Sequence, residues 1–138
     1  MKKIILPGIL AGVLMTIAGF VVSAIFNVIV PGLQDQYMNE AIFRAPDEPL
    51  MMLFLLYPFV TAIIMAWLWD KSKSVVKGKD VWTRGLNFGV AIGLLLTLPA
   101  FVINYSSFNL PFVMILSWTV MSFVNSIIAG LIIVKMNK

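Results

Sequence analysis

Neutral polar side chains are the candidates for chemistry in this sequence, because its long apolar stretches contain no acidic or basic residue. Amides and hydroxyls both donate and accept hydrogen bonds, so a pocket built from them would suit a neutral or lipidic ligand. The alternative is that most of these groups bond across helices or to carbonyls of their own helix. The candidate pocket residues are Asn27, Tyr57, Thr61, Asn104, Ser106, Ser107 and Asn125.

Asn125 is the most informative of these residues, since an amide offers two donors and an acceptor near the middle of the last apolar stretch. We expect it either to clamp two helices together or to line a pocket. Pro58 and Pro99 lie within two other apolar stretches, each toward the end that is predicted to face outward. A proline removes a backbone donor and bends a helix, so two such bends could open the pocket outward, beneath the 31–49 segment. Alternatively, these prolines only reflect the frequency of proline in membrane helices.

Several kinds of chemistry lack the residues that they need. The chain has no cysteine and no histidine, which excludes disulfides, thiolate chemistry and imidazole metal sites. Four acidic residues share one segment but do not have the spacing of a calcium loop. We therefore expect no cofactor, no metal and no enzymatic activity. The net charge of +4 comes without a nucleic-acid-binding motif, so we expect no nucleic-acid partner. The acidic residues are Asp35, Glu40, Asp47 and Glu48.

The composition predicts an integral membrane protein. Of the 138 residues, 61% are apolar and only 12% charged, whereas soluble domains have about 25% charged residues. A helix needs about 20 apolar residues to cross the ~30 Å hydrocarbon core. Four charge-free runs satisfy this length, and they predict an all-α bundle of four transmembrane helices in one domain, residues 1–138. The runs are residues 4–30, 50–69, 86–103 and 110–134.

The distribution of basic residues predicts the orientation. Nine of the ten lie at the two termini and in the 70–85 loop, and Arg44 alone lies on the other side. Because basic residues collect on the cytoplasmic side, we expect both termini inside, in a prokaryotic cell membrane. Lysines next to a membrane attract anionic headgroups. The predicted headgroup contacts are Lys71, Lys73, Lys77 and Lys79, and the predicted interfacial tryptophans are Trp67, Trp69 and Trp82.

Small residues recur every three or four positions in each run. Such stripes let helix backbones approach closely in a bilayer, so we predict that they form the bundle centre. The first and third runs align at an offset of 77 residues, and the second and fourth at 64, which suggests a parallel repeat about an axis along the membrane normal. Chance similarity of Gly-rich segments is the alternative. The predicted packing residues are Gly8, Gly12, Gly19, Gly85, Gly89, Gly93, Ser122, Ser126 and Gly130.

The general layout gives a weak clue to function. A Gly-rich first helix from Pro7 to Gly12, a long first outer loop and a short second one resemble small prokaryotic four-span proteins of unknown function. The Arg, His or Cys patterns of four-span glutathione-dependent enzymes and quinone-linked thiol oxidoreductases are missing. Helical spacing of apolar residues within 31–49 also predicts a helix on the membrane surface. Two functions stay open. The leading one is a non-catalytic bundle that binds as an oligomer or with a partner membrane protein, and the other is a small transporter, pore or lipid-binding protein.

Overall fold

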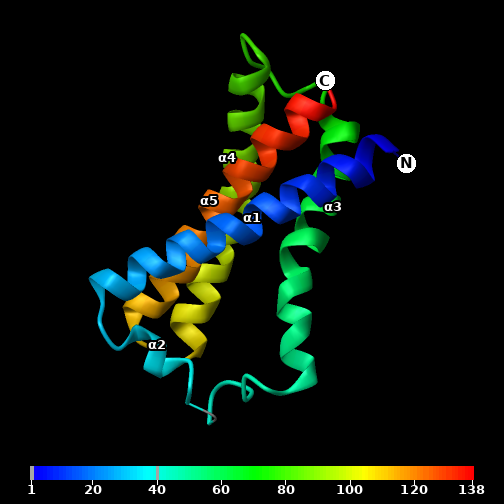
Figure 1. Ribbon diagram of the computed structural model, residues 1–138. Helices are drawn as coiled ribbons and strands as arrows, with labels where there is room; N and C mark the ends of the chain where they lie inside the picture. The colour runs from blue at the N-terminus through cyan, green and yellow to red at the C-terminus, as the bar shows by residue number, and fades with distance from the viewer. Residues whose placement is uncertain (1, 40) are drawn as a thin grey trace.

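The protein is described by a computed structural model over residues 2–39 and 41–138, which is helical and contains no strand in that part of the chain (Figure 1). Four of its helical segments are long and apolar enough to cross a membrane, which confirms the all-α prediction. The elements in order are α1 (Lys2–Ile29), α2 (Leu33–Gln36), η1 (Pro49–Leu56), α3 (Tyr57–Ser72), α4 (Val81–Ser107) and α5 (Phe112–Met136).

Two helix starts differ from the prediction for local reasons. α4 begins at Val81 instead of residue 86, because Asp80 caps it by accepting hydrogen bonds from the backbone N–H groups of Trp82 (2.8 Å) and Thr83 (2.9 Å). The second span changes from the 3₁₀ helix η1 to α3 at Tyr57, with Pro58 in the first turn of α3. A first-turn proline sacrifices no intrahelical bond, so Pro58 marks a junction between two helix types instead of a bend within one.

The helices form two antiparallel pairs that meet at glycines. Where α1 crosses α3, a Cβ added to Gly8 would lie 2.9 Å from the Cα of Ile63. Where α4 packs along α5, a Cβ added to Gly130 would lie 2.7 Å from the Cα of Gly89. Real Cβ atoms do not approach backbone this closely, so these glycines allow the helix contacts, as predicted from the small-residue stripes. α1 also packs against α5, and this contact joins the two pairs.

The two pairs are not arranged about a twofold axis. α1 packs along α5, whereas the equivalent pair, α3 and α4, meets near one end through Trp69 and Phe88, whose ring centroids are 5.3 Å apart. In Figure 1, η1 and the start of α3 run apart from α4 and α5, whereas the rest of α3 packs against α5 near the basic end. The residues that contact the equivalent glycines of α1 and α4 are Ile63 on α3 and Leu131 on α5. They are 68 positions apart, which is one helical turn more than the offset of 64 in the sequence alignment. Duplication of the sequence stays a prediction.

The segment between α1 and η1 folds back onto α5. Within its described residues, 30–39 and 41–48, it contains only the four-residue α2, and not the longer surface helix that the apolar spacing predicted. The indole N–H of Trp118 on α5 donates to the hydroxyl of Tyr37 (2.7 Å), and Phe43 packs edge-on against the same indole. These long-range contacts hold the segment in turns, since a regular helix would carry Tyr37 and Phe43 to different places.

Both termini and the segment between α3 and α4 lie at one end of the bundle (Figure 1). This end, which carries the lysines predicted to face the cytoplasm, is called the basic end below, and the end with α2 and η1 is called the opposite end. The core is centred between the basic end and the middle of the helices. It includes Ala11, Met15, Ala62, Met65, Ala66, Trp69, Phe88, Ala129, Ile133 and Val134.

Candidate functional site

The predicted pocket residues are spread over separate places. Asn27 on α1 is half-buried and donates from Nδ2 to Oε1 of Gln34 (3.3 Å). Tyr57 is exposed at the start of α3, and Thr61 lies one turn further along that helix. The end of α4 carries Asn104, Ser106 and Ser107, of which both serines are exposed. Two hollows stand out on the surface, and none of the predicted pocket residues lines either of them.

The buried hydroxyls bond within their own helices. Thr97 donates to the carbonyl of Gly93 (2.8 Å), Ser117 to that of Met114 (2.7 Å) and Ser126 to that of Ser122 (2.9 Å). A hydroxyl satisfied by its own helix needs no ligand. These residues therefore follow the structural alternative, and Ser126 lies on the face of α5 that contacts Gly89 and Gly93 of α4.

Asn125 differs from the hydroxyl residues. Only 4% of it is exposed, and its Oδ1 atom has no hydrogen-bond partner among the described residues. A buried polar atom without a partner is costly and rare in proteins, so it needs an explanation. Asn125 lies on α5 against α1, where a Cβ added to Gly19 would be 3.9 Å from its Nδ2. The site can accept a hydrogen bond from a neutral donor.

Gly19 does not have the packing role that its spacing predicted. The atom nearest to an added Cβ would be the sulfur of Met121 at 3.7 Å, which is an ordinary van der Waals contact. The other predicted packing glycines leave no such room, since an added Cβ would lie within 3.0 Å of a neighbouring helix. α1 and α5 therefore stand farther apart at Gly19 than the other helix pairs do at their glycines, and Asn125 borders this wider region.

A group of hydrogen bonds ties the basic end together. The indole N–H of Trp69 donates to the carbonyl of Asn137 (2.6 Å), and Asn137 Nδ2 donates to the carbonyl of Lys3 (3.2 Å). Lys73 forms an ion pair with Asp70 (3.1 Å) and donates to Asn137 Oδ1 (3.3 Å). The tail after α5 is thereby fastened to α1 and α3. Asn137 is 4% exposed, and nothing in its sequence surroundings distinguished it.

Two residues at the basic end differ from their expected surroundings. Lys73, a predicted headgroup contact, has its ammonium engaged by Asp70 and Asn137, and a third of its side chain is exposed. Trp69 was expected at the membrane interface, but it is completely buried. It sits behind Arg84, whose guanidinium lies 5.0 Å from the ring centroid. Trp67 and Trp82 are about half exposed, and their place at the membrane interface stays a prediction.

The segment between α3 and α4 is folded and not a free loop. Arg84 donates to the carbonyl oxygens of Lys73 and Val76, and Asn87 Nδ2 donates to that of Lys77 (2.9 Å). These bonds use the backbone of the segment and leave the other lysines directed outward. The exposed lysines of this region are Lys71, Lys77 and Lys79.

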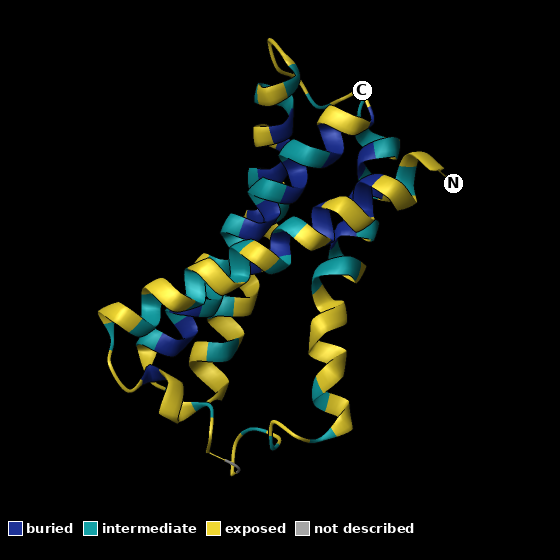
Figure 2. Ribbon diagram, viewed as in Figure 1, coloured by how far each residue is buried: buried dark blue, intermediate teal, exposed yellow. Residues whose placement is uncertain are grey.

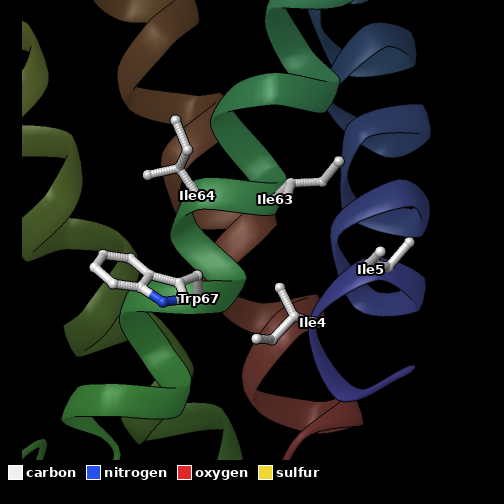
Figure 3. Close-up of a pocket in the computed structure, with 5 residues that line it drawn as sticks. All are labelled: Ile4, Ile5, Ile63, Ile64 and Trp67. Carbon is white, nitrogen blue, oxygen red and sulfur yellow. The ribbon is translucent and has the colours of Figure 1, made fainter. Parts of the chain in front are cut away.

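An apolar hollow of about 380 Å³ lies between α1 and α3 near the basic end (Figure 3). Ile4 and Ile5 from α1 and Ile63, Ile64 and Trp67 from α3 line it. A second hollow, of about 290 Å³, follows one face of α1 toward the opposite end. The lining of both is almost wholly apolar, so these hollows suit hydrocarbon and not a polar solute.

The first part of the second span has few neighbours. All residues of η1 except Met51 are exposed, as Figure 2 shows, with Met52 and Phe54 each 69% exposed. A helical turn that belongs to a packed bundle normally buries one face. η1 buries none, because α3 diverges from α4 and α5 toward the opposite end.

No group of three or more histidine, cysteine or acidic side chains that could hold a metal ion occurs within residues 2–39 and 41–138. Glu40, one of the acidic residues weighed as a cation ligand, lies outside the described residues. Comparisons of the chain with protein families, with characterised proteins and with solved structures find no match.

Proposed function

We propose that this protein is a non-catalytic helical bundle of the cell membrane that acts by binding another transmembrane helix, either in a second copy of itself or in a partner membrane protein. The supporting observation is the exposure of η1 on all sides. Apolar segments associate in a bilayer through van der Waals packing, and η1 makes little of that packing within its own chain. A 3₁₀ helix of eight residues is also unusually long, which favours a segment that gains packing from outside the chain.

The proposed orientation puts the basic end, with both termini, in the cytoplasm of a prokaryotic cell. The exposed lysines and the half-exposed Trp67 and Trp82 at this end support it, because such residues favour the cytoplasmic interface. The chain has no cysteine, so one introduced at Val75, which is 72% exposed, is a specific reporter. We expect Val75→Cys to react with a membrane-impermeant maleimide only after the cells are opened. Labelling of intact cells would contradict this orientation.

Helix binding is tested by site-specific photo-cross-linking in native membranes. Phe54 in η1 and Phe20 in α1 are 69% and 67% exposed, so Phe54→Cys and Phe20→Cys form a matched pair. Each cysteine is coupled to benzophenone maleimide, irradiated, and its adducts are weighed by mass spectrometry. We expect protein adducts at Phe54 and lipid adducts at Phe20.

An adduct with the mass of two chains would identify an oligomer, and an adduct with a different protein would identify a partner subunit. If both positions yield lipid adducts alone, the proposal is wrong. The same membranes, gently solubilised and examined by native mass spectrometry, give the stoichiometry without any cross-link.

A second candidate function is the binding or transport of a small neutral ligand, and the unpartnered Oδ1 of Asn125 favours it. A ligand hydroxyl or amide N–H could satisfy this acceptor beside Gly19. Native mass spectrometry should then detect a discrete small molecule in the wild type that Asn125→Leu no longer retains. A less stable Asn125→Leu variant with no lost ligand would instead make Asn125 a helix clamp.

A further inference from the structure

The hollow between α1 and α3 opens along the side of the bundle and not toward its axis. Ile64 and Trp67 on its wall are 52% and 49% exposed, so the hollow is continuous with the surface that faces lipid. Figure 3 shows Ile4 and Ile5 on one side, and the three α3 residues on the other. Its wall consists of aliphatic and indole side chains from two helices, which is the chemistry that a hydrocarbon chain needs.

Positive charge borders the end of this hollow. Lys71 lies four residues after Trp67 on α3, which puts it on the same face one turn nearer to the basic end. Lys2 and Lys3 directly precede Ile4 on α1, within about 5 Å along the helix axis. All three lysines are exposed, and none forms an ion pair within residues 2–39 and 41–138.

Asp70, which precedes Lys71 in the sequence, is already paired with another lysine. Asp70 is held by Lys73 at 3.1 Å and also accepts from Asn137 Nδ2 at 3.4 Å. The three lysines at the rim of the hollow, Lys2, Lys3 and Lys71, therefore keep a net positive charge beside the first turn of α1. The partial positive charge of the α1 N-terminus adds to the same field. The hollow thus combines an apolar wall with a cationic rim at one end.

We propose that this hollow binds an anionic phospholipid of the leaflet at the basic end, with one acyl chain between Ile4 and Ile64 and the phosphate beside Lys2, Lys3 and Lys71. The charge complementarity is with a headgroup phosphate, and the apolar wall excludes a free inorganic anion as the main occupant. Trp67 places its indole at the junction of chain and headgroup, where tryptophan is favoured. This site differs from the predicted headgroup contacts at Lys77 and Lys79, which line neither of the two hollows.

Quenching of Trp67 fluorescence by brominated lipid reports which lipid occupies the hollow. The full-length protein is reconstituted into vesicles of phosphatidylcholine that contain a small fraction of phosphatidylglycerol, with bromine on the acyl chains of one lipid or the other. Bromine quenches nearby indoles, and the difference between wild type and Trp67→Phe isolates the Trp67 signal. We expect brominated phosphatidylglycerol to quench Trp67 at about one fifth or less of the concentration that brominated phosphatidylcholine requires, because one lysine near the surface already generates a preference of about fivefold.

The lysine variants decide whether the preference belongs to the hollow. Lys2→Gln, Lys3→Gln and Lys71→Gln combined should abolish it, whereas Lys77→Gln with Lys79→Gln, two exposed lysines on the same end, should leave it unchanged. Equal quenching by the two lipids, or an equal loss in both sets of variants, would refute a specific site. Quenching of Trp82 serves as an internal control, because its indole is 53% exposed outside the hollow. A preserved Trp82 signal shows that the variant is folded and inserted.

Discussion

Gly130 is the position where a single methyl group should be most damaging. It lies on α5 at the contact with α4, and a Cβ there would be 2.6 Å from the carbonyl oxygen of Gly85 and 2.7 Å from both Cα and N of Gly89. All three neighbours are backbone atoms, so no side chain can rotate away. Gly130→Ala therefore has to push α4 and α5 apart.

The size of the effect follows from these distances. Ordinary contact begins at 3.4 Å, so the helices must separate by about 0.8 Å to relieve the shortest of these distances. A gap of that size forfeits a quarter to a half of the dispersion energy of each pair of facing atoms, and overpacking in cores costs about 1–3 kcal/mol. Alanine in place of glycine stabilises a helix by about 1 kcal/mol, which offsets part of the loss. We expect a net decrease of about 1–2 kcal/mol in the free energy of unfolding.

Gly19→Ala is the matched control, because an added Cβ there makes ordinary contacts at 3.7 and 3.9 Å. The same helix-propensity term applies without the separation of helices, so this variant should be unchanged or more stable by up to about 1 kcal/mol. Both proteins are unfolded in mixed micelles by increasing the fraction of SDS, with tryptophan fluorescence as the signal. If Gly130→Ala is as stable as Gly19→Ala, close backbone approach does not hold α4 and α5 together.

Three further predictions concern the ends of the bundle. Hydrogen bonds from the backbone and hydroxyl of Thr83 keep the pKa of Asp80 below its ordinary value of 3.8, so its ionised form stabilises the fold above that pH. The stability advantage of the wild type over Asp80→Asn should therefore shrink as the pH falls below about 3.8, measured by the same SDS titration; a constant difference would exclude the effect. Trp118→Phe removes the bond to Tyr37, worth about 1 kcal/mol, so trypsin should cut after Arg44 faster. Asn137→Ala removes the side-chain bonds to Lys3 and Lys73 and should cost about 1–2 kcal/mol, with increased exposure of the tail to carboxypeptidase.

The packing glycines show how far reasoning from spacing reaches. Gly8, Gly89 and Gly130 lie at helix contacts as their regular spacing predicted, because a stripe of small residues in an apolar helix has few other uses. Gly19 continues the same stripe but lies where α1 and α5 stand farther apart. The difference depends on the angle at which the helices cross, and that angle is set by contacts distant from Gly19 in the sequence.

The candidate site residues were less predictable. The predicted pocket combined polar residues that share a depth in the membrane, but depth does not determine which helices are neighbours. α3 diverges from α4, so Tyr57 and Asn104 belong to separated parts of the bundle. The aromatic contact of Tyr37 with Trp118 joins residues 81 positions apart, and no local pattern reveals such a pair.

The sequence by itself determined the four apolar helices, their approximate lengths and the asymmetry of charge between the two ends. These properties follow from hydropathy, charge and the thickness of a bilayer, all of which act on each segment separately. Only the tertiary structure decided that Lys73 is paired with Asp70, that Trp69 is buried, that nearly all of η1 is exposed and that an apolar hollow lies between α1 and α3. These features depend on which helices pack together, since a side chain in a membrane helix meets lipid or protein according to its neighbours and not according to its own polarity.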